Sequence, residues 1–206
     1  MNNIANYRIM ETLYQSEKTS VFLATNDAQE KFVLKTTTNP YPTPDELKRF
    51  EREYEISKNV QTKGVAKVLS LLPQGNSLVI LQEYIDAPTA KTLLQTRSLS
   101  VPEVLQIAIH LTNTLEQIHY RNVIHKDING NNILIATDTL TPYIIDFDIA
   151  SQLTIEKTEI ENVNNLQGTL AYISPEQTGR MNRSIDYRTD LYSLGIVLYE
   201  MLTGEL

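Results

Sequence analysis

The pattern of apolar and polar positions divides the chain into a strand-rich first part and a helical second part. In the first part, short apolar segments bounded by turn residues predict strands. These segments are 7–13, 20–25, 31–36, 65–72 and 77–85. The sequence Thr43-Pro44-Asp45-Glu46 has the form of a capping box with proline at the first helical position, so we expect a helix that runs to about Val60.

From residue 86 onward, the apolar residues recur with helical spacing. Ser100-Val101-Pro102-Glu103 repeats the capping-box pattern and predicts a long helix up to Tyr120. Segment 132–146 predicts a short hairpin, and segment 151–167 predicts a polar loop. Segment 189–203 predicts a last helix that ends before Gly204. The expected fold class is α+β, with an antiparallel β first lobe (1–85) and a mainly α second lobe (86–206).

Composition and charge narrow the class of protein. The 206 residues include 18 basic and 25 acidic side chains, and the net charge of −7 argues against a nucleic-acid partner. No cysteine is present, which excludes disulfides and thiolate chemistry, and three histidines leave little scope for a histidine metal site. The most apolar stretch, 191–199, is far shorter than the ~20 residues of a membrane span, and the first residues show no signal-peptide pattern. We therefore expect a cytoplasmic protein without a membrane partner.

Two polar motifs in the second part carry candidate chemistry. The first is the loop sequence His-Lys-Asp-Ile-Asn-Gly-Asn-Asn at 125–132, and the second is Ile-Asp-Phe-Asp at 145–148. Asp127 and Asn132 lie five residues apart on a loop and can meet around one phosphate and one divalent cation. Asp146 follows an apolar strand and can supply a second metal ligand. Either motif alone has a plain explanation as a polar turn, but the pair is much more specific.

Glu53 is expected to form an ion pair. A helical projection at about 100° per residue places Glu53 in the middle of the apolar arc of its helix. A carboxylate on an apolar face is costly unless it is paired. We expect Lys35, on the strand at 31–36, to be its partner, and the alternative is that Arg49 or Arg52 neutralises Glu53 at the surface.

At these residues the sequence resembles the eukaryotic-type protein kinase family. The resemblance covers about residues 7 to 206. The catalytic-loop and metal-loop matches are His125, Asp127, Asn132, Asp146 and Phe147. Segment 168–176 resembles the end of an activation segment, and segment 189–195 resembles the central helix of the large lobe.

The resemblance implies a bilobal kinase fold and an ATP- and Mg²⁺-dependent transfer of phosphate to Ser or Thr of a protein substrate. The catalytic residues that it implies are Asp127, Asn129 and Thr169. The implied metal ligands are Asn132 and Asp146. The implied nucleotide-binding residues are Lys35, Glu53, Leu13, Val21, Glu83 and Ile85. Asp127 is the implied base, and Thr169 supports it and favours Ser/Thr substrates. Asp190 is implied to accept hydrogen bonds from the backbone of the catalytic loop, whereas His110 and His119 receive no role.

The sequence also departs from the family pattern. The three glycines of the phosphate-covering loop are replaced by Tyr14, Ser16 and Thr19, which predicts a stiffer or more open loop and weaker ATP binding. The transfer-stabilising lysine is replaced by Asn129, and the metal-loop glycine is replaced by Asp148. Lys126 replaces the arginine that the family has before the catalytic Asp. Asn165 occupies the usual phosphorylation site of the activation loop, so we expect no dependence on phosphorylation at residue 165.

These departures keep two alternatives open. One is a catalytically weak or inactive kinase-like module that binds a nucleotide or a partner within a larger sensor protein. The other is a small-molecule phosphotransferase of the aminoglycoside-kinase type, which shares the Asp-to-Asn loop and the Asp-Phe-Asp sequence. That class lacks the segment at 168–176 and the helix motif of Asp190, both of which this chain has.

Segments 125–129 and 168–183 resemble a particular branch, the N-terminal kinase-like domains of large bacterial hybrid sensor kinases. This branch implies downstream sensor and histidine-kinase modules as partners, and it makes Asn129 an ordinary residue. A complete domain of the family continues past the helix at 189–203. We therefore expect the 206 residues to be a C-terminally truncated domain that is poorly soluble or weakly active by itself.

Overall fold

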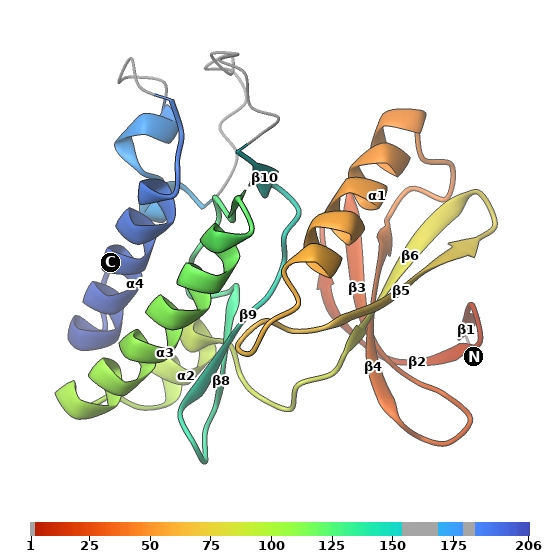
Figure 1. Ribbon diagram of the computed structural model, residues 1–206. Coiled ribbons are helices and arrows are strands. Elements are labelled where there is room, and N and C mark those ends of the chain that lie inside the picture. Colours follow the sequence, from red (N-terminus) through yellow and green to blue (C-terminus); the bar gives the residue numbers. More distant parts are fainter. Residues whose placement is uncertain (1–2, 154–168, 179–183) are drawn as a thin grey trace. The chain divides into compact units, whose positions relative to one another are not determined.

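A computed structural model describes residues 3–153, 169–178 and 184–206, and these form two compact units (Figure 1). The first unit comprises Met1–Gln61 and Ala66–Ile85, and the second comprises Thr62–Val65 and Asp86–Leu206. The short segment Thr62–Val65 groups with the second unit because the Gly64 carbonyl oxygen accepts a hydrogen bond from Ile144 N at 2.8 Å and Val65 forms a parallel bridge with Ile144.

The first unit contains one antiparallel sheet and one helix. The strand order is β1-β2-β3-β4-β6-β5. The strands are β1 (Asn3–Ile4), β2 (Tyr7–Gln15), β3 (Thr19–Thr25), β4 (Lys31–Thr37), β5 (Val68–Gln74) and β6 (Ser77–Glu83), and the helix is α1 (Pro44–Asn59). Helix α1 packs against β5 and β6. Successive side chains of a strand point to opposite faces, so Ile80 joins the core beneath α1 while Val79 and Leu81 join a second core on the other face.

Local signals in the sequence explain the start of α1. Thr43 N donates to Glu46 Oε2 at 2.7 Å and Glu46 N donates to Thr43 Oγ1 at 3.3 Å, so the predicted capping box is confirmed. The strand expected at 65–72 instead begins at Val68. The reason is that Val65 itself belongs to the second unit, where it bridges Ile144, so the strand of the first unit begins only after it.

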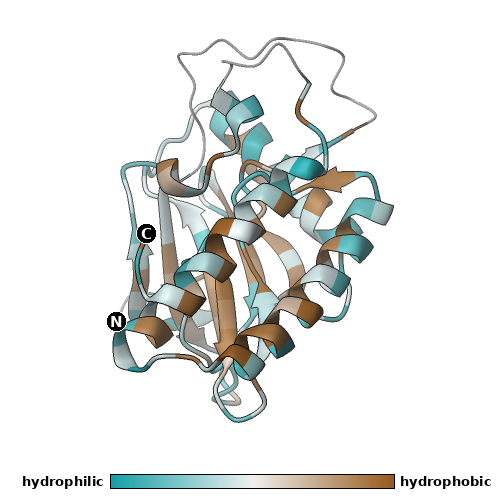
Figure 2. Ribbon diagram, turned by 90° about the vertical axis from the view of Figure 1, so that its left-hand side faces the viewer, coloured by the Kyte–Doolittle hydropathy of each residue, from teal (hydrophilic) through white to brown (hydrophobic). Residues whose placement is uncertain are grey.

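The second unit is mainly helical. Its elements are α2 (Ala90–Thr96), α3 (Val101–Tyr120), β7 (Val123–Ile124), β8 (Ile133–Ala136), β9 (Thr141–Ile144), β10 (Ser151–Gln152), the 3₁₀ helices η1 (Leu170–Tyr172) and η2 (Pro175–Thr178), and α4 (Arg188–Thr203). Strand β8 pairs with β9 and β7 pairs with β10, both antiparallel. Helix α3 packs against β7, β9 and α4. Figure 2 shows the apolar segments that run along these helices.

The predicted α+β class, with an antiparallel sheet followed by mainly helical structure, is confirmed. The predicted C-cap is also present, because Gly204 has φ 77° and its N–H donates to the Glu200 carbonyl oxygen at 2.8 Å. The second hairpin strand ends at Ile144, two residues earlier than expected. Asp146 therefore lies beyond the hairpin, with a left-handed φ of 66°. Within the described ranges, no helix is long and apolar enough to cross a bilayer.

Candidate active site

Asp190 holds the backbone of the catalytic loop. This carboxylate is fully buried in the first turn of α4 and accepts hydrogen bonds from His125 N at 2.9 Å and from Lys126 N at 2.8 Å. The architectural contact expected for Asp190 is therefore present. His119, to which the sequence assigned nothing, also contacts Asp190, with Nε2 at 2.8 Å from Oδ2. The three contacts fix the entry to the loop, where Lys126 has a left-handed φ of 68°.

His125 connects the catalytic loop to the segment after β9. Its Nε2 lies 3.1 Å from the Ile145 carbonyl oxygen, and Asp127 N donates to its Nδ1 at 3.3 Å. These partners assign the neutral tautomer that carries the proton on Nε2. The ring is fully buried and packs on Phe147, with ring centroids 4.7 Å apart. His125 thus acts through packing and hydrogen bonding.

Asp127 has its two carboxylate oxygens held by different segments. Oδ1 accepts from Thr169 N at 3.0 Å and from Thr169 Oγ1 at 3.3 Å. Oδ2 accepts from Asn132 Nδ2 at 2.8 Å. The structure thus brings together Asp127, Asn132 and Thr169, and their hydrogen bonds hold the Asp127 carboxylate in a fixed orientation. A fixed carboxylate can accept a proton from a bound hydroxyl group.

Asn129 lies in the same loop, but its side chain is almost fully buried. Its Nδ2 donates to the Asp127 carbonyl oxygen at 3.1 Å, and its Oδ1 accepts from Asn131 N at 2.8 Å. Both ends of the amide therefore stabilise the loop conformation. This geometry favours a positioning role for Asn129, while its predicted catalytic role stays a prediction.

Two side chains of the second unit have the chemistry of magnesium ligands. Asn132 makes its contacts to Asp127 through Nδ2, so Oδ1 is the atom that can bind a cation. Asp146 follows β9, and its Oδ1 accepts from Asp148 N at 3.2 Å. Among the described residues, no group of three or more His, Cys, Asp or Glu side chains could hold a metal alone. One carboxylate and one amide oxygen fit Mg²⁺, which commonly completes its shell with water and substrate phosphates.

Lys35 and Glu53 form a buried ion pair in the first unit. Lys35 Nζ lies 2.6 Å from Glu53 Oε1, and the two residues are 5% and 1% exposed. The predicted pairing is therefore present. Lys35 is positioned because β4 pairs with its neighbouring strands in a fixed register. Glu53 is positioned because it lies on the apolar face with which α1 packs. A cation held in this way on a rigid strand can bind an anionic ligand such as a phosphate.

The remaining candidate nucleotide residues also lie in the first unit. Val21 is directly opposite Lys35 in the β3–β4 register, so the two side chains share a face of the sheet. Leu13 is 45% exposed. Glu83 ends β6, and its N–H donates to the Lys67 carbonyl oxygen at 2.9 Å, whereas Ile85 lies beyond the strand. Their predicted role in binding a nucleotide stays a prediction.

The turn between β2 and β3, which lacks the family's glycines, is stabilised by hydrogen bonds of Ser16. Ser16 Oγ accepts from Thr19 N at 3.0 Å and from Lys18 N at 3.3 Å, and Ser16 N donates to the Thr19 carbonyl oxygen at 2.8 Å. A side-chain hydroxyl therefore takes up the backbone groups of the turn between β2 and β3. The expectation of a stiffer or more open loop with weaker ATP binding stays a prediction.

Three functional candidates were missed by sequence reasoning. Gln177 Nε2 donates to the Lys126 carbonyl oxygen at 2.9 Å, which ties η2 to the catalytic loop. Tyr172 donates its hydroxyl proton to Glu200 Oε2 at 2.6 Å, and burial together with this carboxylate raises the pKa of Tyr172. The argument used for Glu53 could have found Glu200, because both are carboxylates on an apolar helix face. The predictions for Asn165 and for segments 154–168 and 179–183 lie outside the described residues.

Comparison with known proteins gives a consistent set of similarities. Residues 7–206 match the family model described as protein kinase domain. The chain is 31% identical over 201 residues to a probable serine/threonine-protein kinase of Clostridium perfringens, covering 96% of this chain and 29% of that protein. It is 28% identical over 204 residues to the serine/threonine-protein kinase PrkC of Bacillus subtilis, covering 97% and 31%. It is 31% identical over 162 residues to the serine/threonine-protein kinase PknB of Mycobacterium tuberculosis, covering 76% and 25%. The chain thus spans less than a third of the length of these curated relatives.

Proposed function

The chain belongs to the protein kinase family, as a domain of the serine/threonine type, and from this premise we propose that it transfers the γ-phosphate of ATP to a Ser or Thr hydroxyl of a protein. The observation that carries the proposal is the Asp127 carboxylate, with Oδ1 held by Thr169 and Oδ2 held by Asn132. Such an arrangement supports in-line phosphoryl transfer, in which catalysis rests on positioning and charge stabilisation.

Asp127 is the proposed base. It takes the proton of the substrate hydroxyl as the hydroxyl oxygen forms its bond to the γ-phosphorus, and the bond from phosphorus to the β–γ bridging oxygen breaks to leave ADP. Thr169 and Asn132 keep the accepting carboxylate in one orientation. Bound at Asn132 Oδ1 and Asp146, Mg²⁺ would neutralise the charge on the phosphates. Asn129 supports this geometry by fixing the loop backbone.

The first unit would supply the nucleotide contacts. Lys35 would bind phosphate oxygens, and Glu53 would keep its ammonium group in place. We assign apolar contacts with the base to Leu13 and Val21, and backbone contacts to Glu83 and Ile85. These assignments follow from the family resemblance and from the positions of Leu13 in β2, Val21 in β3, Glu83 at the end of β6 and Ile85 just beyond it.

A second candidate function is a kinase-like module that binds ATP without transferring phosphate. The buried amide of Asn129 and the closed turn at Ser16 favour it, because both replace groups that usually contact the phosphates. The small-molecule phosphotransferase alternative has no such support, since the matches described above are to protein kinases. We propose a cytoplasmic location, with sensor and histidine-kinase modules of a longer chain as partners.

Phosphate transfer from labelled ATP tests the proposal directly. With casein and the chain itself as acceptors, Asp127→Asn should lower the rate about 10²- to 10⁴-fold, because it removes the proton acceptor. Asp138→Asn is the matched control, since Asp138 lies in the exposed turn between β8 and β9, and it should keep the rate. ATP binding without any transfer by the unaltered chain would favour the non-catalytic module instead.

A further inference from the structure

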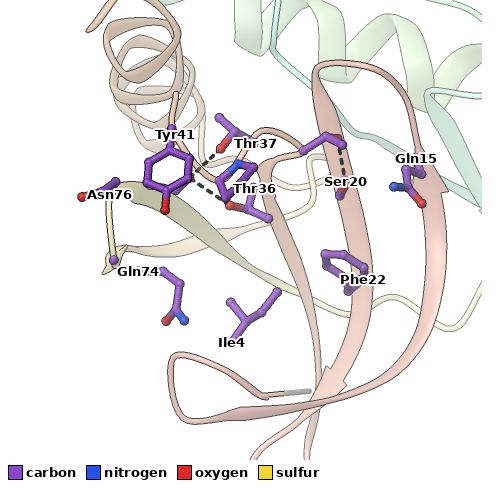
Figure 3. A pocket seen from close by; sticks show the side chains of 13 residues that line it. Ile4, Gln15, Ser20, Phe22, Thr36, Thr37, Tyr41, Gln74 and Asn76 are labelled. Atoms are coloured by element: carbon purple, nitrogen blue, oxygen red, sulfur yellow. Dashed lines mark hydrogen bonds between the residues drawn. The ribbon is translucent and has the colours of Figure 1, made fainter. Parts of the chain in front are cut away.

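The first unit contains a pocket with a hydroxyl-rich floor (Figure 3). Its volume is about 520 Å³, which lies in the range of small-molecule sites. The floor hydroxyls, together called the hydroxyl cluster, are Ser20, Thr36, Thr37, Thr38 and Ser77. Thr36 follows Lys35 on β4, and adjacent residues of a strand point to opposite faces. Phe22, which also lines the pocket, packs with Val79 and Leu81 on the face of the sheet away from α1. Thr36 and Phe22 therefore place the pocket on the face opposite the Lys35–Glu53 pair, distinct from the candidate active site.

The proton of Ser20 is used inside the hydroxyl cluster. A hydroxyl group has one proton to donate and two lone pairs that can accept. Thr38 Oγ1 donates its proton to the Ser16 carbonyl oxygen at 2.9 Å. The 2.8 Å contact between Ser20 Oγ and Thr38 Oγ1 must therefore use the Ser20 proton. Ser20 Oγ keeps its lone pairs.

The other three hydroxyl protons are used in the same way. Thr36 Oγ1 donates to the Leu78 carbonyl oxygen at 2.9 Å, and Thr37 Oγ1 donates to the Asn39 carbonyl oxygen at 3.0 Å. The 2.6 Å contact between Ser77 Oγ and Thr37 Oγ1 then uses the Ser77 proton. Because each shortest contact uses a different proton, all five hydroxyl protons are already donated, and only lone pairs remain for a ligand. The floor therefore accepts hydrogen bonds and has no proton left to donate.

The rim of the pocket has the complementary chemistry. Gln74 Oε1 accepts from Ala5 N at 2.7 Å, so its remaining amide group is a donor. Gln15 and Asn76 add two further carboxamides, which can both donate and accept. Tyr41 is 74% exposed, and its ring provides a flat apolar surface beside the floor. None of the residues that line the pocket is charged.

We infer that this pocket binds an uncharged, polyhydroxylated small molecule of the size of a mono- or disaccharide. Its hydroxyl protons would be donated to the hydroxyl cluster, and its oxygens would accept from the carboxamide rim. An anion is disfavoured because the floor presents only lone pairs. An ammonium ion is disfavoured because the pocket offers no carboxylate to offset the loss of its hydration.

Titration of the ¹⁵N-labelled chain with maltose tests the inference by NMR. We expect saturable shifts of the Ser20, Thr36 and Ser77 amide signals, with a Kd on the order of 1 mM or lower. Ser20→Ala removes an accepting oxygen, and Tyr41→Ala removes the ring, so each should weaken binding about fivefold or more. Tyr120→Ala is the matched control, because Tyr120 is an 84% exposed tyrosine outside the pocket, and it should leave the Kd unchanged.

Each other outcome overturns the inference. Shifts that do not saturate, or that occur away from the hydroxyl cluster, would show that maltose does not occupy the pocket. Tighter binding of putrescine than of maltose would show that the site selects a cation. Equal Kd values for the unaltered chain, Ser20→Ala and Tyr41→Ala would show that neither the floor nor the ring binds the ligand. The HSQC spectrum of each variant reports independently whether it is folded.

Discussion

At the scale of single residues, buried carboxylates organise the polar parts of both units. Asp190 is fully buried and holds two backbone amides of the catalytic loop together with His119. Glu53 is 1% exposed and holds the ammonium group of Lys35. A buried charge is tolerated only with such partners, so each of these side chains constrains residues that are distant in the sequence.

Removing one member of the Lys35–Glu53 pair should destabilise the chain strongly. Lys35→Met keeps the length of the side chain but leaves the Glu53 carboxylate buried without its cation. The expected loss in the free energy of unfolding is about 3–5 kcal/mol. Urea unfolding followed by circular dichroism measures it.

The matched variants show whether the pair or the residue type matters. Lys48→Met, at an exposed position of α1, should change stability little. The double variant Lys35→Met with Glu53→Leu should recover most of the loss, because no unpaired charge is then buried. If the double variant were as unstable as Lys35→Met, the buried carboxylate would not be the cause.

At the scale of elements, the helix starts are stabilised by short polar sequences. Ser100 donates to Glu103 Oε2 from its backbone N and from its hydroxyl, both at 2.8 Å, and Arg97 Nη1 lies 2.8 Å from Glu103 Oε1. The hydrogen bonds from Ser100, and then the Arg97 contact, lower the pKa of Glu103 to about 2. The N-terminal turn of the folded helix therefore stabilises the ionised form of Glu103.

This lowered pKa makes the stability of α3 depend on acid pH. Because the pKa of Glu103 lies below its ordinary value of 4.5, its contribution is fully present above about pH 4.5 and is lost as the pH falls through 2. Glu103→Gln should thus be less stable than the unaltered chain at pH 7, and the difference should shrink between pH 4.5 and 2. Urea midpoints over this range measure it, with Glu116→Gln, at an exposed position of α3, as the control. A difference that does not vary with pH would contradict the assignment.

The elements also show what could be predicted from the sequence. The capping boxes at Thr43 and Ser100 and the Gly204 cap were predictable because each depends on residues within one turn. Helix α2 was missed because its seven residues make only about two turns, too few for a clear repeat of apolar positions. Strands β7 and β10 were missed because each has two residues and pairs with a distant segment.

The candidate site divides in the same way. The Lys35–Glu53 pair followed from helical periodicity. The spacing within one loop indicated that Asp127 and Asn132 lie close together, but not that they form a direct hydrogen bond. The contacts of Gln177 with Lys126 could not be predicted, because they depend on how η2 folds back on the catalytic loop. Likewise, the burial of Asn129 follows from the local loop conformation and leaves no trace in composition or periodicity.

At the scale of the whole molecule, the second unit exposes an apolar helix face. The α4 face consists of Leu191, Tyr192, Tyr199 and Leu202, which are 44%, 44%, 56% and 52% exposed. These residues recur at the spacing of one side of a helix, and Gly195 lies between them without a side chain. Soluble monomers rarely expose large contiguous apolar patches, so this face bears on how the polypeptide of residues 1–206 behaves in solution.

The polypeptide of residues 1–206 should therefore self-associate through the α4 face. We expect its sedimentation coefficient to rise with concentration and the dye ANS to fluoresce in its presence, because exposed apolar surface drives both. The paired change Leu191→Lys with Leu202→Lys should lower both signals. Asn113→Lys with Gln117→Lys adds the same charge to exposed polar positions of α3 and should leave both signals unchanged, which separates loss of apolar surface from charge repulsion. A chain that sediments as a monomer at every concentration and binds no ANS would show that the α4 face does not drive association.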